Sequence, residues 1–237
     1  MDAHELSGRE KALLTHETLN QTYKRLTLDN SRRTPMHELI STMLSHRTTH
    51  ADEVMAYNTM LERFGDWEGV MQADTAEMAD AIKTTRYPDQ KVPQIQETLR
   101  IIKEERGEIE IEFLRDIPVA DAMAWLTKLP GVGPKTATLL LLFNFKKPVL
   151  PVDTHVFRVS QRVGIIGAKV TANKAHDLLL QMLPPDPEEL FNFHKHLFWH
   201  GQRICTWYTP KCEECVLNSF CNYYQDVRAK GIDKKAA

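Results

Sequence analysis

The sequence predicts an all-α protein. Apolar residues recur at helical spacing along most of the chain. The clearest example is the face formed by Met36, Leu39, Ile40, Met43 and Leu44. A helix start precedes it, because Thr34 suits the N-cap and Pro35 the first helical position. The alternating segment Glu108–Glu112 is interpreted as a connector rather than a strand, so helices account for nearly all of the expected structure.

The same spacing predicts the helices in order. They are Glu17–Leu26, one beginning at Pro35, Ala51–Phe64, Thr75–Lys83, Val92–Glu105, Ala120–Leu129, Thr136–Phe145, Thr154–Val163, Ala172–Leu183 and Pro187–His200. Gly201 suits the position just after the last of these helices. The chain becomes small, polar and basic near its end, and residues 226–237 are predicted to form a disordered tail.

Composition restricts the class of protein. Of the 237 residues, 42% are hydrophobic and 26% are charged, as in ordinary soluble globular proteins. The formal net charge of −2 excludes a global attraction to nucleic acid, so any DNA-binding face must be a local basic patch. The longest apolar run, Leu139–Phe143, is too short to span a bilayer, and residues 1–20 lack a secretory signal. A soluble, intracellular protein is expected.

All four cysteines lie close together, with the spacing Cys205-x6-Cys212-x2-Cys215-x5-Cys221. This clustering argues against a disulfide framework and indicates one metal or cluster site. Four thiolates in one loop can surround a tetrahedral zinc ion or a [4Fe–4S] cube, and the spacing alone favours neither. Arg203 and Lys211 belong to the same region, either as a basic edge beside DNA or as solvated surface side chains.

A Gly-x-Gly turn, Gly131-Val132-Gly133, leads into the apolar helix that contains Lys135. Glycines tolerate positive φ and close backbone approach, and the unpaired N–H groups of the next helix would face a phosphate oxygen. Such a turn binds the DNA backbone without reading its sequence, whereas a plain connection between helices is the alternative. The helix macrodipole disfavours a positive charge on Lys135, which is therefore a candidate amine nucleophile as well as a candidate phosphate partner.

Asp153 precedes the helix expected from Thr154. The ordinary role of an aspartate in that place is to cap the helix N-terminus. A carboxylate within reach of a lysine can also accept its proton, or stabilise a sugar cation as it develops. Neither Lys135 nor Asp153 identifies an active site alone.

Four separated motifs occur together in the order and approximate spacing of one known family. They are the segments LPGVGPKTA, VDTHVFRV and HLFWHGQRIC, and the C-x6-C-x2-C-x5-C loop. On these motifs the chain, over the range 34–223, resembles the endonuclease III family of helix-hairpin-helix DNA glycosylases. Members of that family carry a [4Fe–4S] cluster. The resemblance implies that a cluster with a structural role is held by Cys205, Cys212, Cys215 and Cys221.

The resemblance also implies an activity. Family members flip a damaged base out of duplex DNA and cleave its N-glycosidic bond. The residue that matches Lys135 attacks C1′ of the sugar and forms a Schiff base, β-elimination nicks the strand, and the residue that matches Asp153 assists. Related adenine glycosylases lack this lysine, so Lys135 implies a bifunctional glycosylase and abasic-site lyase. Its expected substrate is duplex DNA that contains either an abasic site or a damaged pyrimidine, and the damage is expected to be oxidation.

The implied architecture is two helical lobes with a DNA-binding cleft between them. A six-helix lobe with the hairpin would cover residues 28–147, and a cluster lobe would combine residues 1–27 with 148–225. The expected protein is a monomer without membrane association, which in a bacterium or archaeon works in the cytoplasm at the nucleoid. DNA contacts are expected from Arg47, Tyr87, Lys91, Gly131, Gly133, Thr136, Arg203 and Lys211.

The sequence departs from the family pattern in the segments that probe DNA. Arg47 stands where the family has a glutamine, and His50 where it has an aspartate. Arg86-Tyr87-Pro88 replaces Gly-Leu-Tyr. Arginine can fill the gap left by a flipped base and tyrosine can stack on bases, whereas variation of solvent-exposed loops is the alternative. Pro134 replaces the usual basic residue beside Lys135, and these changes predict weaker DNA affinity and a shifted range of lesions.

Two other functions remain open on the sequence. One is an enzyme that performs only the lyase step, on abasic sites that already exist. The other is a protein without catalytic activity, or with zinc in place of the cluster, that binds damaged DNA. The altered probe residues leave room for both.

Overall fold

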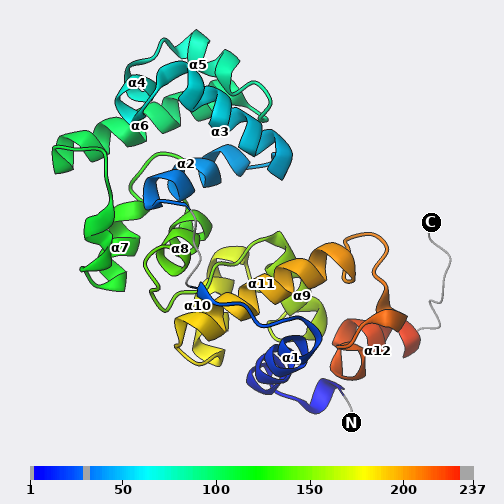
Figure 1. The fold of residues 1–237 in the computed structure, drawn as a ribbon. Coiled ribbons are helices and arrows are strands. Elements are labelled where there is room, and N and C mark those ends of the chain that lie inside the picture. The colour runs from blue at the N-terminus through cyan, green and yellow to red at the C-terminus, as the bar shows by residue number, and fades with distance from the viewer. Residues whose placement is uncertain (1–2, 29–32, 230–237) are drawn as a thin grey trace. The chain divides into compact units, whose positions relative to one another are not determined.

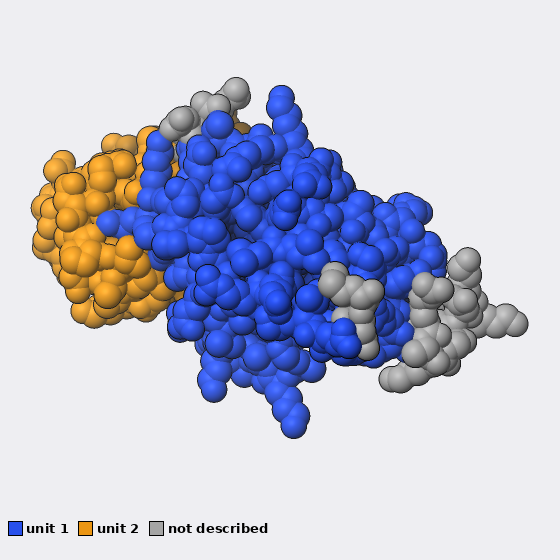
Figure 2. All heavy atoms as spheres, turned by 90° about the horizontal axis from the view of Figure 1, so that it is seen from below, with its two compact units in different colours: residues 1–30, 146–237 blue, residues 31–145 orange. Residues whose placement is uncertain are grey.

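The computed structural model describes residues 3–28 and 33–229, which fold into helices and connecting loops (Figure 1). Within these ranges no strand is present, so the all-α prediction is confirmed. The chain divides into two compact units, residues 31–145 and residues 1–30 with 146–237 (Figure 2). No helix in the described ranges is both long and apolar enough to cross a bilayer.

Helices α2 to α8 form the 31–145 unit. Their bounds are α2 Pro35–Ser45, α3 His50–Phe64, α4 Trp67–Gln72, α5 Thr75–Ala81, α6 Pro88–Arg106, α7 Val119–Leu126 and α8 Pro134–Phe143. Helix α2 is central, because it packs against α3, α6 and α8. Its predicted apolar face is buried. Burial of each such aliphatic side chain contributes about 1.5–3 kcal/mol to the free energy of folding. The centre of the unit therefore holds together the loop after α2 and the starts of α6 and α8.

The remaining helices form the other unit. Their bounds are α1 Gly8–Thr22, α9 Thr154–Val163, α10 Ala172–Met182, α11 Pro187–Arg203 and α12 Asn222–Ala229. Helix α11 packs against α9 and α1, α10 packs against α1, and α12 packs against α9. This arrangement places the cysteine segment, which follows α11, beside α9.

The helix predicted over Glu17–Leu26 lies elsewhere. Helix α1 begins at Gly8, where Ser7 and Glu10 form a reciprocal capping box, and it ends at Thr22. Polar residues occupy its buried face, among them Lys11, which is 1% exposed and donates a hydrogen bond to the Val163 carbonyl at 3.1 Å. An apolar pattern could not reveal a helix whose buried side is partly polar.

The structure differs from the predicted helices in three further ways. Helices α4 and α12 were not expected, and α12 extends through residues 226–229, so the predicted disordered tail begins too early. Residues 230–237 of that tail lie outside the described residues. Gly201 lies inside α11 rather than after it. A Cβ at Gly201 would come within 2.8 Å of the His155 Cβ, so the glycine allows α11 to approach α9 closely.

Candidate active site and cysteine cavity

The turn between α7 and α8 uses its two glycines differently. Gly131 has φ of +75°, and a Cβ there would lie 2.7 Å from the Gln94 Oε1 atom. Gly133 has φ of −96° and ψ of 179°, so it is extended and forms the N-cap of α8. A Cβ on Gly133 would meet no heavy atom within 4 Å. Positive φ is therefore needed only at Gly131, whereas Gly133 leaves the start of α8 uncovered.

Lys135 is the second residue of α8 and is half-buried behind this turn. Within residues 3–28 and 33–229, no hydrogen bond or ion pair engages its ammonium group. Pro134, the first residue of α8, has no N–H, so the donors without a partner inside the helix are the N–H groups of Lys135 and Thr136. The start of α8 thus presents an amine and two N–H donors in one place.

The side chain of Thr136 is not presented to a ligand at this site. The residue is 1% exposed, and its Oγ1 atom lies 3.3 Å from the Nε2 atom of His46. Burial, assisted by the charge of Lys135, lowers the pKa of His46. A neutral imidazole therefore lies next to the start of α8. The sequence motifs gave His46 no role.

Asp153 is the N-cap of α9, in the unit that does not contain Lys135. Its Oδ1 atom accepts hydrogen bonds from the N–H groups of His155 at 2.9 Å and Val156 at 2.8 Å. The capping role is confirmed. No hydrogen bond to the second carboxylate oxygen, Oδ2, is found in the described part of the chain, and the residue is half-buried. Asp153 can therefore cap α9 and still offer one oxygen to a substrate.

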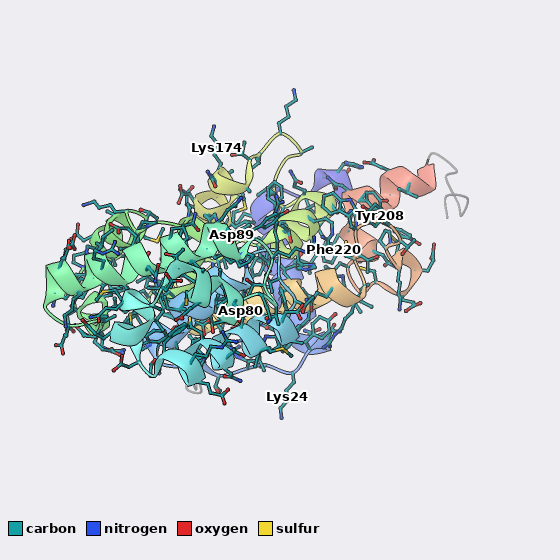
Figure 3. The ribbon with its side chains drawn as sticks, turned by 90° about the horizontal axis from the view of Figure 1, so that it is seen from above. Lys24, Asp80, Asp89, Lys174, Tyr208 and Phe220 are labelled. Carbon is teal, nitrogen blue, oxygen red and sulfur yellow. The ribbon has the colours of Figure 1, made fainter. Side chains whose placement is uncertain are left out.

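The two expected DNA-probing residues share an uncommon backbone conformation. Arg47 has φ of 55° and Tyr87 has φ of 60°, in the left-handed region that non-glycine residues rarely adopt. Both are exposed, and the Tyr87 side chain is 48% exposed. Tyr87 is also the N-cap residue of α6 and is followed by Pro88 and the exposed Asp89 (Figure 3).

Lys91 is placed differently from a surface cation. It is 6% exposed, and its Nζ atom donates to the carbonyls of Leu44 at 2.5 Å and His46 at 3.0 Å, and to Thr48 Oγ1 at 3.0 Å. Because the ammonium group is directed into the protein, the structure does not present it for the expected DNA contact. Spacing along α6 could not show this, because the acceptors lie in a distant segment of the chain.

The four cysteines line one cavity beside α9 and α11. They belong to a loop with two 3-10 turns, Cys212–Glu214 and Asn218–Phe220. Burial raises the pKa of Cys215 to about 12 and that of Cys221 to about 11. Thiols buried in this way ionise when a coordinated metal supplies positive charge. The cavity has the donor set of a metal-containing group.

A zinc ion and a [4Fe–4S] cluster are the two groups that four neighbouring thiolates can hold. In the described ranges, no set of three or more His, Cys, Asp or Glu side chains is positioned to hold a metal ion. A zinc ion needs four ligand atoms within about 2.3 Å of one point. The four cysteines line one cavity, and four thiolates are a ligand set that suits either a zinc ion or a [4Fe–4S] cluster.

Two arginines of α9 hold the cysteine loop. Arg158 is 7% exposed and donates to the carbonyls of Gly201 at 2.7 Å and Cys205 at 3.0 Å. Arg162 donates to the carbonyls of Thr206 at 2.6 Å and Trp207 at 2.7 Å. The sequence motifs did not single out either arginine. Their spacing of four residues on the helix that Asp153 caps was the available signal.

Exposed cations and exposed aromatic rings occur at the end of α11 and in the same loop. Arg203 and Lys211 are exposed, as expected for DNA-contacting residues. Trp207 is 60% exposed and Tyr208, labelled in Figure 3, is 89% exposed, whereas Phe220 is buried. Exposed cations next to exposed rings suit a nucleic-acid backbone with stacked bases.

Comparison with known proteins identifies the family. Residues 40–185 match the family described as HhH-GPD superfamily base excision DNA repair protein. Endonuclease III of Thermotoga maritima is 34% identical over 218 residues, which are 92% of this chain and 96% of that protein. A solved endonuclease III, trapped as a covalent intermediate with DNA, has a TM-score of 0.79 at 24% identity over 93% of this chain and 98% of that one. A solved thermostable thymine-DNA glycosylase has a TM-score of 0.75 at 24% identity, over 92% of this chain and 98% of that one. Both structural similarities are evidence for the fold alone. The chain therefore belongs to the endonuclease III family, within the HhH-GPD superfamily of base excision DNA repair proteins.

Proposed function

We propose that the chain is a bifunctional DNA glycosylase and abasic-site lyase that acts on damaged pyrimidines in duplex DNA. The expected damage is oxidation of the base. The observation that carries this proposal is the setting of Lys135. Two buried lysines, Lys11 and Lys91, each donate to protein acceptors, whereas no described group engages the ammonium of Lys135. It lies at an uncovered helix start that can bind phosphate.

The chemistry divides between two residues. The Nζ lone pair of Lys135 attacks C1′ as the N-glycosidic bond breaks, and the base leaves with that bonding pair and takes up a proton. The Asp153 carboxylate accepts the amine proton and stabilises the positive charge on the sugar. Ring opening gives a Schiff base. Loss of a C2′ proton then expels the 3′ phosphate with the C3′–O electron pair, and water releases the sugar from Lys135.

A [4Fe–4S] cluster is proposed for the cysteine cavity, with Cys205, Cys212, Cys215 and Cys221 as its ligands. Its role in this proposal is structural. The cavity thiols and the arginines of α9 would then fix the loop that follows Arg203 and carries Lys211. A purified protein that is brown and contains equal amounts of iron and sulfide is expected, whereas a colourless protein with one bound zinc ion contradicts the cluster.

Borohydride trapping tests the catalytic proposal. The protein is incubated with duplexes that contain either thymine glycol or a preformed abasic site, and the covalent adducts are measured. We expect adducts with both duplexes, lost in Lys135→Ala and kept in Lys128→Ala, which removes an exposed lysine before the turn. An adduct on the abasic duplex alone indicates a lyase-only enzyme or an enzyme that excises a different lesion. Absence of adducts on both indicates a protein that only binds damaged DNA.

A further inference from the structure

The buried ammonium of Lys91 lies where two loops of the 31–145 unit meet. The first loop, His46–Thr49, follows α2, and the second, Thr84–Tyr87, precedes α6. The three acceptors of Lys91 Nζ use all three of its N–H donors. Burial lowers the pKa of Lys91 to about 8, so the charged form with three donors predominates at neutral pH.

One hydroxyl connects the two loops. Thr48 Oγ1 accepts hydrogen bonds from Lys91 Nζ at 3.0 Å and from the Arg86 backbone N–H at 3.2 Å, and it donates to the His46 carbonyl at 3.2 Å. The first loop is thereby bonded to the second through Thr48 and Lys91. Thr84 attaches the second loop to the first turn of α3, because its Oγ1 donates to the Asp52 carbonyl at 2.9 Å.

The same lysine fixes the backbone around both exposed probe residues. Its side chain binds His46 and Thr48, the two neighbours of Arg47. Through Thr48 Oγ1 the same ammonium is connected to the backbone N–H of Arg86, the residue before Tyr87. Left-handed conformations of non-glycine residues cost about 1–3 kcal/mol each and persist where the surroundings over-determine them. The Lys91 side chain supplies that constraint around Arg47, and its partner Thr48 bonds the backbone of Arg86, the residue before Tyr87.

We infer that Lys91 is a positioning residue for lesion recognition, whose buried ammonium locks the loops of Arg47 and Tyr87 into one rigid surface. This inference rests on the proposed function, in which these two side chains probe the duplex. A rigid surface sets how far both side chains enter the DNA. If the two loops moved independently, contact with the stacked bases would displace them, and the target nucleotide would stay inside the DNA duplex.

Two variants break the lock without removing a probe residue. Lys91→Met keeps most of the side-chain volume but removes the charge and the donors, and Thr48→Val keeps the lysine but removes the connecting hydroxyl. Lys83→Met is the matched control, because Lys83 is an exposed lysine near the second loop that pairs with Asp80 on the surface. Thermal unfolding confirms that each variant is folded.

The first readout does not need base excision. A duplex carries 2-aminopurine opposite a stable tetrahydrofuran abasic analogue, and its fluorescence reports unstacking of the opposite base. We expect the wild type and Lys83→Met to increase this fluorescence equally at saturating protein. Lys91→Met and Thr48→Val should lose most of the increase. Equal fluorescence in all four proteins overturns the inference, even if the wild type excises no base and the proposed glycosylase activity fails.

The second readout separates recognition from chemistry. Single-turnover excision of thymine glycol should fall about 10- to 100-fold in Lys91→Met, because displaced groups cost rates of that order. The protein concentration at half-maximal rate and the trapping of a preformed abasic site should change less than about 3-fold, since Lys135 is untouched. Adding Arg47→Ala to Lys91→Met should slow excision little further. Fully additive losses, or equal losses on both substrates, contradict a positioning role.

Discussion

Gly133 is the position where stability and DNA binding should respond in opposite directions. Its backbone is already in the extended N-cap conformation, and a Cβ there meets no heavy atom within 4 Å. Gly133→Ser therefore fits without strain. The serine hydroxyl would accept the N–H of Thr136, as Thr34 Oγ1 accepts the N–H of His37 in α2.

The structure allows both effects to be estimated. Removing the freedom of a glycine stabilises a compatible site by about 0.4–1 kcal/mol, and the cap adds a few tenths. The melting temperature should rise by about 2–4 °C in a chain of this size. The serine hydroxyl would accept the Thr136 N–H, which could then no longer donate to a DNA phosphate. A hydrogen bond from an N–H to a charged phosphate is worth about 1.5–3 kcal/mol. Affinity should fall roughly 10- to 100-fold.

Thermal unfolding and fluorescence anisotropy measure the two quantities, the latter with a duplex that contains a tetrahydrofuran abasic analogue. The salt dependence of binding should keep its slope, because no cation is removed. Gly167→Ser is the matched control, since Gly167 is exposed with open space around its Cβ and lies in the other unit. Wild-type affinity in a stabilised Gly133→Ser protein would refute phosphate binding at the start of α8.

Three further predictions concern single residues. Asp153→Asn keeps the oxygen that caps α9, so the melting temperature should stay within about 2 °C, while single-turnover excision falls about 100-fold or more. Burial, then Lys135, lowers the folded pKa of His46, so stability should decline as pH falls below about 6.5, and urea unfolding should show a smaller decline in His46→Gln. Arg162→Gln removes the guanidinium bonds to Cys205 Sγ and to the carbonyls of Thr206 and Trp207, so a chelator should bleach the visible absorption of the proposed cluster several-fold faster.

Local signals explain the parts of the fold that the sequence predicts well. The start of α2 at Pro35 and the bounds of α9 at Thr154–Val163 agree with the structure, because a capping residue marks each start. Helix α1 was misplaced because Lys11 and Thr15 lie on its buried face. Gly201 was misread because a helix interior accepts glycine where a neighbouring helix comes close.

Some residues of the candidate site could be predicted from the adjacent sequence, and others could not. Lys135 and Asp153 stand out because their roles depend on a helix start, which the adjacent sequence specifies. The roles of Lys91 and Arg158 depend on carbonyl groups more than forty residues away in the chain. No periodic pattern indicates which backbone acceptor a buried cation will meet, so only the folded structure shows these contacts.

The central claim is that Lys135 forms the covalent bond to DNA, and peptide mapping tests it most directly. The borohydride-reduced adduct on abasic DNA is digested with nuclease and trypsin, and mass spectrometry locates the remaining sugar fragment. The account predicts the fragment on Lys135, within a peptide that extends past the missed cleavage at that residue. A fragment on Lys91, on Lys128 or on the N-terminal amine, with Lys135 unmodified, would contradict it.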